Sequence, residues 1–192
     1  GSGKSSLVQS LFHLYEFEKG SVQINGLQAS LDSTPGNRFV PLDYFRRAMG
    51  VISQDLFLFQ GTLRDNLTID PQLSDQDILN ALKRAGLQSW FENLPNGLSW
   101  QIEERGRNLS QGEKQLISIA RCLLQQAPII IMDEATSSID PQTEEHLVAA
   151  TEAYFKERSQ IIIAHRLSTL KSCDRVLWLH HGEVRALDTP HR

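Results

Sequence analysis

The chain has 192 residues, of which 40% are hydrophobic and 22% charged, and its formal net charge is −4. This length and composition fit one globular domain with a substantial core. The mild acidity argues against a general nucleic-acid binder, and no apolar run approaches the about 20 residues that a membrane-spanning helix needs. The two cysteines, Cys122 and Cys173, match no metal-binding or redox spacing, so we expect free thiols in a reducing compartment.

The first six letters, GSGKSS, are the second half of the P-loop pattern G-x-x-x-x-G-K-[ST]. Gly3 would allow close approach to phosphate oxygens, Lys4 would reach the β- and γ-phosphates, and the Ser5 hydroxyl would ligate Mg²⁺. A helix that begins here points its unpaired N–H groups at the phosphates. Its apolar positions predict a buried face, made of Leu7, Val8, Leu11, Phe12, Leu14 and Tyr15. A glycine-rich helix start without a ligand is the structural alternative, and this short match does not decide between the two.

Several short elements are predicted between residues 21 and 53. Residues 21–26 alternate like an edge strand and end in an Asn-Gly turn. Turn-forming residues crowd positions 28–39, which predicts a surface loop. A short helix at 41–47 and a strand at 49–53 follow. Gln54 comes directly after that strand, where it could contact Mg²⁺ or water, although a solvated loop residue is the plainer interpretation.

From about residue 57 to residue 126 the pattern is helical. Residues 74–77 are typical of a helix start, and Gly86 is typical of a helix end. Between them lies an apolar stripe of Ile78, Leu79, Leu82 and Ala85.

A second helix start follows at Ser110, which forms a capping-box pattern with Glu113. The same helix start, with Gly112 in its first turn, is also suited to an anion. Composition does not decide between a cap and a phosphate contact.

The run at 129–132 is four apolar residues, which predicts a strand buried on both faces of a parallel sheet. Asp133 and Glu134 follow at once. Two carboxylates at the end of a buried strand are costly unless something uses them, such as a metal ion. Ligands of open α/β sheets bind at the carboxyl ends of strands, so the sequence predicts a site at this edge.

Another helix start and another apolar strand are predicted in the last third of the chain. Asp140 and Pro141 are typical of the N-cap and first position of a helix. An apolar strand is predicted at 161–164 and ends at His165, which would join Lys4, Asp133 and Glu134 at the same sheet edge. A purely structural histidine is the alternative. The predicted position of His165 at the same sheet edge as Lys4, Asp133 and Glu134 favours a functional role. Residues 175–179 and 183–186 predict a hairpin.

Six motifs in this order resemble the nucleotide-binding domain of ATP-binding cassette (ABC) transporters. They are GSGKS at 1–5, Gln54, LSQGE at 109–113, IIIMDE at 129–134, SSID at 137–140 and His165. The match covers nearly the whole chain, and the set is highly specific although each motif alone is weak. FQGTLRDNL at 59–67 resembles exporters, especially the multidrug-resistance-protein (class C) and multidrug exporter (class B) groups. Residues 104–106 resemble the exporter loop that meets the transmembrane partner.

The resemblance implies an α/β fold: a P-loop NTPase with a RecA-like, mostly parallel sheet core and an inserted α-helical signature subdomain. We expect a catalytic core of residues 1–56 and 127–192, and a subdomain of about residues 57–126.

The resemblance also implies a role for each motif. The ATP-binding residues would be Gly1, Ser2, Gly3, Lys4, Ser5, Ser6 and Gln54. Mg²⁺ would be held by Ser5, Gln54 and Asp133. Glu134 would polarise the attacking water, and His165 would contact the γ-phosphate. The ATP of a partner domain would be contacted by Ser110, Gln111, Gly112 and Glu113, and Asp140 would couple the two sites.

We therefore expect Mg²⁺-dependent ATP hydrolysis that powers export, at the cytoplasmic face of a plasma or inner membrane. The expected partners are a transmembrane domain and a second nucleotide-binding domain in a head-to-tail dimer, and no nucleic acid. The chain departs from the family pattern at Glu113, where Gln is usual, and in a longer loop at 28–39. The family's adenine-stacking aromatic would precede residue 1, and the C-terminus looks short of a final helix, so we expect a domain fragment.

Two rival functions remain. The first is an ATP-dependent dimerisation switch with little hydrolysis, which Glu113 keeps open and which Glu134 and His165 oppose. The second is a soluble ABC ATPase of DNA repair or translation. Such proteins usually carry a coiled-coil insertion or a second cassette, and neither is present in these 192 residues.

Overall fold

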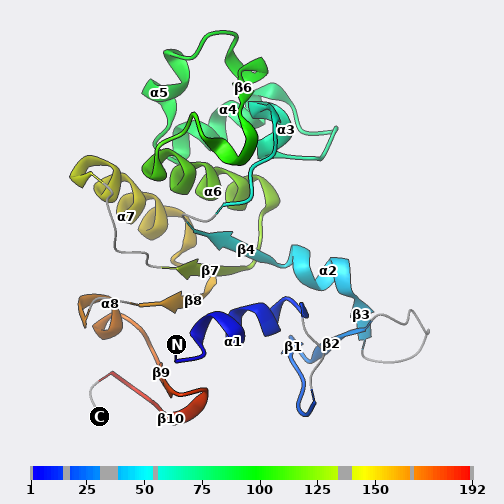
Figure 1. The fold of residues 1–192 in the computed structure, drawn as a ribbon, viewed down its shortest axis with the longest axis vertical. Helices are drawn as coiled ribbons and strands as arrows, with labels where there is room; N and C mark the ends of the chain where they lie inside the picture. The colour runs from blue at the N-terminus through cyan, green and yellow to red at the C-terminus, as the bar shows by residue number, and fades with distance from the viewer. Residues whose placement is uncertain are drawn as a thin grey trace. The chain divides into compact units, whose positions relative to one another are not determined.

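The computed structural model describes residues 2–14, 18–30, 39–53, 56–133, 140–164 and 167–190. The chain forms two compact units, a smaller one of Gly1–Ala48 with Ile163–Arg192 and a larger one of Met49–Ile162 (Figure 1). The expected division near residues 57 and 126 stays a prediction.

The larger unit combines a parallel sheet with helices, which confirms the predicted α/β class. Its elements in chain order are β4 (Met49–Ile52), β5 (Gly61–Thr62), α3 (Leu63–Leu67), α4 (Asp75–Arg84), α5 (Gln88–Glu92), η1 (Gly97–Ser99), β6 (Gln101–Ile102), η2 (Glu104–Gly106), α6 (Gln111–Gln125), β7 (Ile129–Asp133), α7 (Pro141–Phe155) and β8 (Ser159–Ile163).

Strand β7 is the middle strand of the sheet β4-β7-β8. It pairs in parallel with β4, from Met49 opposite Ile129 to Ile52 opposite Met132. Its two central isoleucines are at most 1% exposed, as expected for a strand covered on both faces. The predicted buried strand is therefore confirmed, and its carboxyl end is at Asp133. The strand predicted at 161–164 is also present, but β8 begins two residues earlier and ends at Ile163.

Helix α6 organises the larger unit, because it contacts β4 on one side and α3 and α4 on another, with α7 alongside (Figure 1). Its approach to β4 is close. A Cβ atom added at Gly50 would lie 2.7 Å from the sulfur of Cys122. Glycine at this strand position therefore lets the helix reach the sheet. Both cysteines are free thiols, as predicted.

The helix caps in the larger unit follow the sequence predictions. Ser74 and Asp77 form a capping box at the start of α4. After α4, Gly86 adopts φ 84°, and its N–H and that of Leu87 bond to the carbonyls of Lys83 and Leu82, at 3.0 and 2.9 Å. This is the Schellman pattern, which favours glycine because L-residues disfavour positive φ.

The smaller unit is built from short elements. They are α1 (Lys4–Leu11), β1 (Gln23–Ile24), β2 (Leu27–Ser30), β3 (Phe39–Pro41), α2 (Leu42–Arg47), α8 (Leu167–Lys171), β9 (Val176–His180) and β10 (Glu183–Asp188). The predicted turn at Asn25 and Gly26 joins β1 to β2, and the predicted hairpin near the end is β9–β10.

Two expectations for the smaller unit are corrected. The ends of the predicted loop at 28–39 are strands, because β2 pairs with β1 across the hairpin and with β3 in parallel. Pairing on both sides overrides the weak strand propensity of these residues, and positions 31–38 lie outside the described residues. Helix α1 has no buried residue, and Leu7 and Leu14 are exposed. The described residues of this unit therefore do not bury the apolar face that the sequence predicts for α1.

Helix α1 is held at its end rather than along its face. The Arg46 guanidinium donates to the carbonyls of Phe12 and His13, at 2.8 and 3.2 Å.

Among the described residues, every helix is too short or too polar to span a bilayer.

Candidate functional site

The predicted P-loop residues surround the start of α1. Gly3 precedes the helix with φ 95°, a conformation that glycine adopts without strain, and Leu7 N–H closes the first turn on the Gly3 carbonyl at 2.9 Å. The N-cap residue is a glycine, which has no side chain to cap the helix, and Lys4, Ser5 and Ser6 are exposed. A helix N-terminus whose exposed first turn includes the cation Lys4 is suited to an anion. Gly1 lies outside the described residues.

The turn between β9 and β10 lies against this loop, which the sequence did not predict. Gly182 N–H donates to the carbonyl of Ser2 at 3.1 Å, and a Cβ atom on Gly3 would lie 3.2 Å from the Gly182 Cα. Gly3 and Gly182 therefore lie where the backbone of the β9–β10 turn comes close to the backbone before α1. The only signal in the sequence was His181-Gly182, which indicated a turn and nothing about its neighbour.

Asp133 is the last residue of β7 and is half-buried. It lies at the carboxyl end of a parallel strand, as predicted. Gln54, Glu134 and His165 fall outside the described residues, so their predicted roles stay predictions. Taken singly, the carboxylate of Asp133 and the hydroxyl of Ser5 are oxygen donors of the kinds that Mg²⁺ binds, and the two residues belong to different units.

The signature residues form the start of α6. The Ser110 hydroxyl accepts a hydrogen bond from the Glu113 N–H at 3.1 Å, and the Ser110 N–H donates to the Glu113 carboxylate at 2.8 Å. The predicted capping box is confirmed. A glutamine side-chain carbonyl could accept the same bond, so the departure at Glu113 changes the charge of the cap and not its geometry. Ser110 and Gln111 are exposed, whereas Gly112 is buried.

Asp140 caps α7 and lies close to the signature residues through one neighbour. Its carboxylate accepts bonds from the N–H and the hydroxyl of Thr143, at 2.9 and 2.5 Å. These bonds hold the pKa of the Asp140 carboxyl below its usual value. The Thr143 side chain in turn lies against Gly112. The structure thus brings the predicted partner-ATP residues and the predicted coupling residue together.

Arg121, in the middle of α6, is a residue that the sequence analysis missed. Its guanidinium donates to the carbonyls of Asn66 and Phe57, at 2.5 and 2.9 Å. Burial lowers its pKa to about 10, so the side chain is still a cation at neutral pH. Arg121 fixes the segment that follows Gln54 and the end of α3 to the signature helix. The signal available was a single charge inside the apolar run ISIARCLL.

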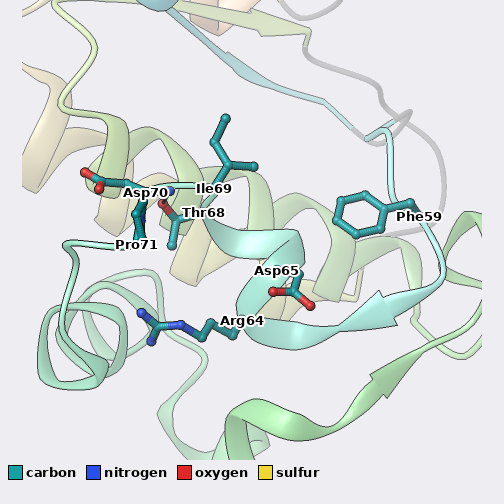
Figure 2. Close-up of a pocket in the computed structure, with 7 residues that line it drawn as sticks. All are labelled: Phe59, Arg64, Asp65, Thr68, Ile69, Asp70 and Pro71. Carbon is teal, nitrogen blue, oxygen red and sulfur yellow. Dashed lines mark hydrogen bonds between the residues drawn. The ribbon is translucent and has the colours of Figure 1, made fainter.

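A second missed feature is a surface pocket of about 380 Å³ on the larger unit (Figure 2). Its walls come from α3 and the segments around it: Phe59, Arg64, Asp65, Thr68, Ile69, Asp70 and Pro71. Ile69, in the pocket lining, is 89% exposed, and Phe57, two positions before the lining residue Phe59, is 79% exposed. Exposed apolar side chains at a pocket make it a candidate interaction site.

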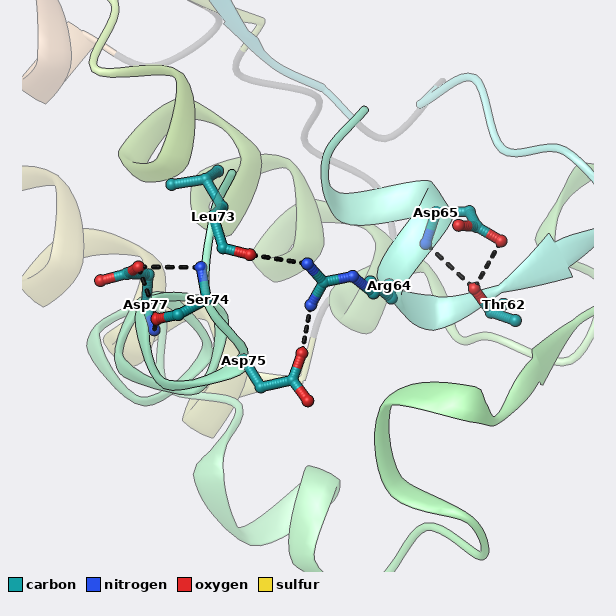
Figure 3. A network of polar contacts seen from close by, with 7 residues as sticks. All are labelled: Thr62, Arg64, Asp65, Leu73, Ser74, Asp75 and Asp77. Carbon is teal, nitrogen blue, oxygen red and sulfur yellow. Dashed lines mark hydrogen bonds and ion pairs between the residues drawn. The ribbon is translucent and has the colours of Figure 1, made fainter. Parts of the chain in front are cut away.

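The pocket wall is held by a polar network (Figure 3). Arg64 pairs with Asp75 and donates to the Leu73 carbonyl at 2.6 Å. Thr62 caps α3 and its hydroxyl bonds to Asp65 at 2.7 Å. These bonds tie α3 to the start of α4 and give the pocket a defined wall.

Comparison with known proteins identifies the family. Residues 1–137 match the sequence profile described as ABC transporter. The chain belongs to the ABC transporter family. The nucleotide-binding domains of this family bind ATP, and the fold found here is theirs.

Two relatives and one solved structure show the breadth of the similarity. The chain is 41% identical over 192 residues to the human mitochondrial iron-sulfur clusters transporter ABCB7, covering 100% of this chain and 24% of that protein. It is 37% identical over 186 residues to the ATP-dependent lipid A-core flippase of Methylobacillus flagellatus, covering 96% of this chain and 30% of that protein. A bacterial Atm1-family ABC exporter with ATP bound superposes with a TM-score of 0.83 at 32% identity, covering 99% of this chain and 32% of that one. The chain thus spans about a quarter to a third of each relative.

Proposed function

We propose that this chain is the ATP-binding and ATP-hydrolysing domain of an ABC exporter. The observation that carries the proposal is the helix start at Gly3 and Lys4, where the N-cap residue is glycine and the first-turn side chains are exposed, in a chain that matches the family over residues 1–137. The relatives named above are transporters, which favours export over a soluble ATPase of DNA repair or translation.

Phosphate binding is assigned to the start of α1. The backbone amides of Gly1, Ser2 and Gly3, with Ser6, would surround the phosphate oxygens, and Lys4 would balance their negative charge. Mg²⁺, held by Ser5, Gln54 and Asp133, would neutralise charge that develops on the phosphates. The protein's own contribution is to hold these groups in place before the reaction begins.

Hydrolysis is assigned to the residues at the carboxyl ends of two strands. Glu134 would orient and polarise the attacking water, and His165 would contact the γ-phosphate. Phosphoryl transfer to water requires mostly positioning and charge stabilisation, which a carboxylate and an imidazole beside the phosphate supply.

Assembly is assigned to the start of α6. Ser110, Gln111, Gly112 and Glu113 would contact the ATP bound by a partner domain, and Asp140 would couple the two sites of a head-to-tail dimer. Ser110 and Gln111 are exposed, which supports their accessibility to a partner domain.

Docking on a transmembrane domain is assigned to the pocket and to the exposed Ile69 and Phe57. Apolar side chains around a pocket with a fixed polar wall suit a short segment of a partner protein. The domain would then work at the cytoplasmic face of a membrane.

Two variants test the chemistry. Lys4→Ala removes a charge that faces the phosphates in the ground state, so it should weaken ATP binding itself. Glu134→Gln keeps the size of the side chain and should abolish steady-state hydrolysis while ATP still binds. Unchanged ATP affinity in the first variant, or near-normal turnover in the second, would remove that residue from its role.

A further inference from the structure

The contact between Gly112 and Thr143 joins the starts of two helices, α6 and α7. A Cβ atom added at Gly112 would lie 2.7 Å from Cγ2 of Thr143, 3.2 Å from its hydroxyl oxygen and 3.3 Å from its Cβ. Real Cβ atoms do not approach another carbon to 2.7 Å. Glycine at position 112 is therefore required by packing within this chain, in addition to anything that its backbone amide binds.

The Thr143 side chain has little freedom to move away. Its hydroxyl donates to the Asp140 carboxylate at 2.5 Å, and its N–H donates to the same carboxylate at 2.9 Å. Threonine is branched at Cβ, so the hydroxyl direction also fixes where the methyl group lies. Any rotation that freed the methyl from position 112 would break the hydroxyl bond to Asp140.

We propose that Thr143 is a positioning residue that sets the place of Asp140 relative to the signature residues 110–113. Its methyl group rests on Gly112 and its hydroxyl holds Asp140, so the two motifs that would face a partner domain move as one. This inference rests on the proposed function, in which both motifs close a partner's ATP site.

Three variants test two interactions separately: the packing of the Thr143 methyl group against Gly112, and the hydrogen bond from the Thr143 hydroxyl to Asp140. Gly112→Ala adds the clashing methyl group. Gly112→Ala with Thr143→Ser removes Cγ2 and keeps the hydroxyl for Asp140. Thr143→Val keeps both branches of the side chain and removes the hydroxyl. Thr151→Val is a matched control, because Thr151 lies on the same helix and its hydroxyl bonds to the Leu147 carbonyl one turn away, at 2.7 Å.

The experiment measures the melting temperature and steady-state ATP turnover of each variant in the protein that contains this chain. Gly112→Ala should lower Tm by about 2–10 °C through overpacking, and adding Thr143→Ser should recover most of that loss. Thr143→Val should lower kcat about tenfold, as loss of a charge-assisted hydrogen bond predicts. Its KM for ATP should be unchanged because the P-loop is untouched. Thr151→Val should leave both constants near those of the parent.

Each contrary result would contradict a different part of the proposal. If Thr143→Ser does not rescue Gly112→Ala, or if Gly112→Ala is as stable as the parent, the contact is wrong. If Thr143→Val has the parent's kcat, the coupling through the hydroxyl is wrong. A parent protein without ATP turnover would contradict the proposed function and with it the coupling of Asp140, while the melting temperatures would still decide the contact.

Discussion

The guanidinium of Arg121 lies 2.9 Å from the carbonyl oxygen of Phe57, 64 residues earlier in the chain. Through this bond the signature helix holds the segment that begins just after Gln54. Gln54, proposed to bind ATP and Mg²⁺, is thus followed by a segment anchored on the helix proposed to reach the partner's nucleotide.

Replacing Arg121 should destabilise the larger unit. Arg121→Met leaves the carbonyls of Phe57 and Asn66 without their donors, which we expect to cost about 1–3 kcal/mol of unfolding free energy. Arg121→Lys keeps the charge but cannot form the same two bonds, so its loss should be smaller. Arg107→Met is the control, because Arg107 is exposed and its nearest carboxylate, Glu103, is 3.8 Å away. Equal urea midpoints for Arg121→Met and Arg107→Met would contradict the assignment.

The buried thiol of Cys122 should make stability depend on pH. Burial raises its pKa to about 12 from an ordinary value of 9.0. Above pH 9 the unfolded chain loses this proton while the folded chain keeps it, so stability falls as pH rises toward 12. The parent's stability relative to Cys122→Ala should therefore drop by about 1 kcal/mol between pH 8 and pH 10. A difference between the two urea midpoints that stays constant with pH would show that the thiol is not buried as described.

The capping box at Ser110 can be separated from its proposed contact with a partner's ATP. Ser110→Ala removes the bond to the Glu113 N–H and should cost about 1 kcal/mol of stability. Ser110→Asp preserves a cap but places a negative charge where phosphate is expected. We expect Ser110→Asp to keep the parent's melting temperature and to lose ATP turnover. Normal turnover in Ser110→Asp would leave Ser110 with the capping role alone.

The strands and caps of the larger unit were predictable because their signals are local. The apolar run before Asp133, the Ser74 and Ser110 caps and the Gly86 helix end each need only neighbouring residues to be interpreted. The motif order also predicted the family.

What the sequence did not predict depends on contacts distant in the chain. The sequence around Arg121 does not indicate that its partners are Phe57 and Asn66. The sequence around Gly112 does not indicate a contact with Thr143, 31 positions later. The strand at Leu27–Ser30 forms because two partners pair with it, although its own residues suggested a loop. The pocket arises from the packing of α3, which periodicity does not describe.

The exposed side chain of Ile69 should affect the coupling of this domain to transport and should not affect the stability of its fold. Ile69→Ala removes apolar surface that is 89% exposed, so unfolding free energy should change by no more than about 0.5 kcal/mol. If the pocket docks a transmembrane partner, transport by membrane vesicles should fall while ATP binding is kept. Val148→Ala, another exposed apolar residue on the same unit, should leave transport unchanged. Equal transport by the two variants would place the docking surface elsewhere.

We propose that two copies of this domain close on ATP, and that the signature residues of each copy complete the ATP site of the other. Light scattering of the nucleotide-binding domain, expressed without its transmembrane partner and carrying Glu134→Gln, measures this directly. We expect a dimer with ATP, a monomer without it, and a monomer in both conditions when Ser110→Arg is added, although that variant still binds ATP. A Glu134→Gln domain that stays monomeric while saturated with ATP, or a Ser110→Arg form that dimerises as well as its parent, would contradict the claim.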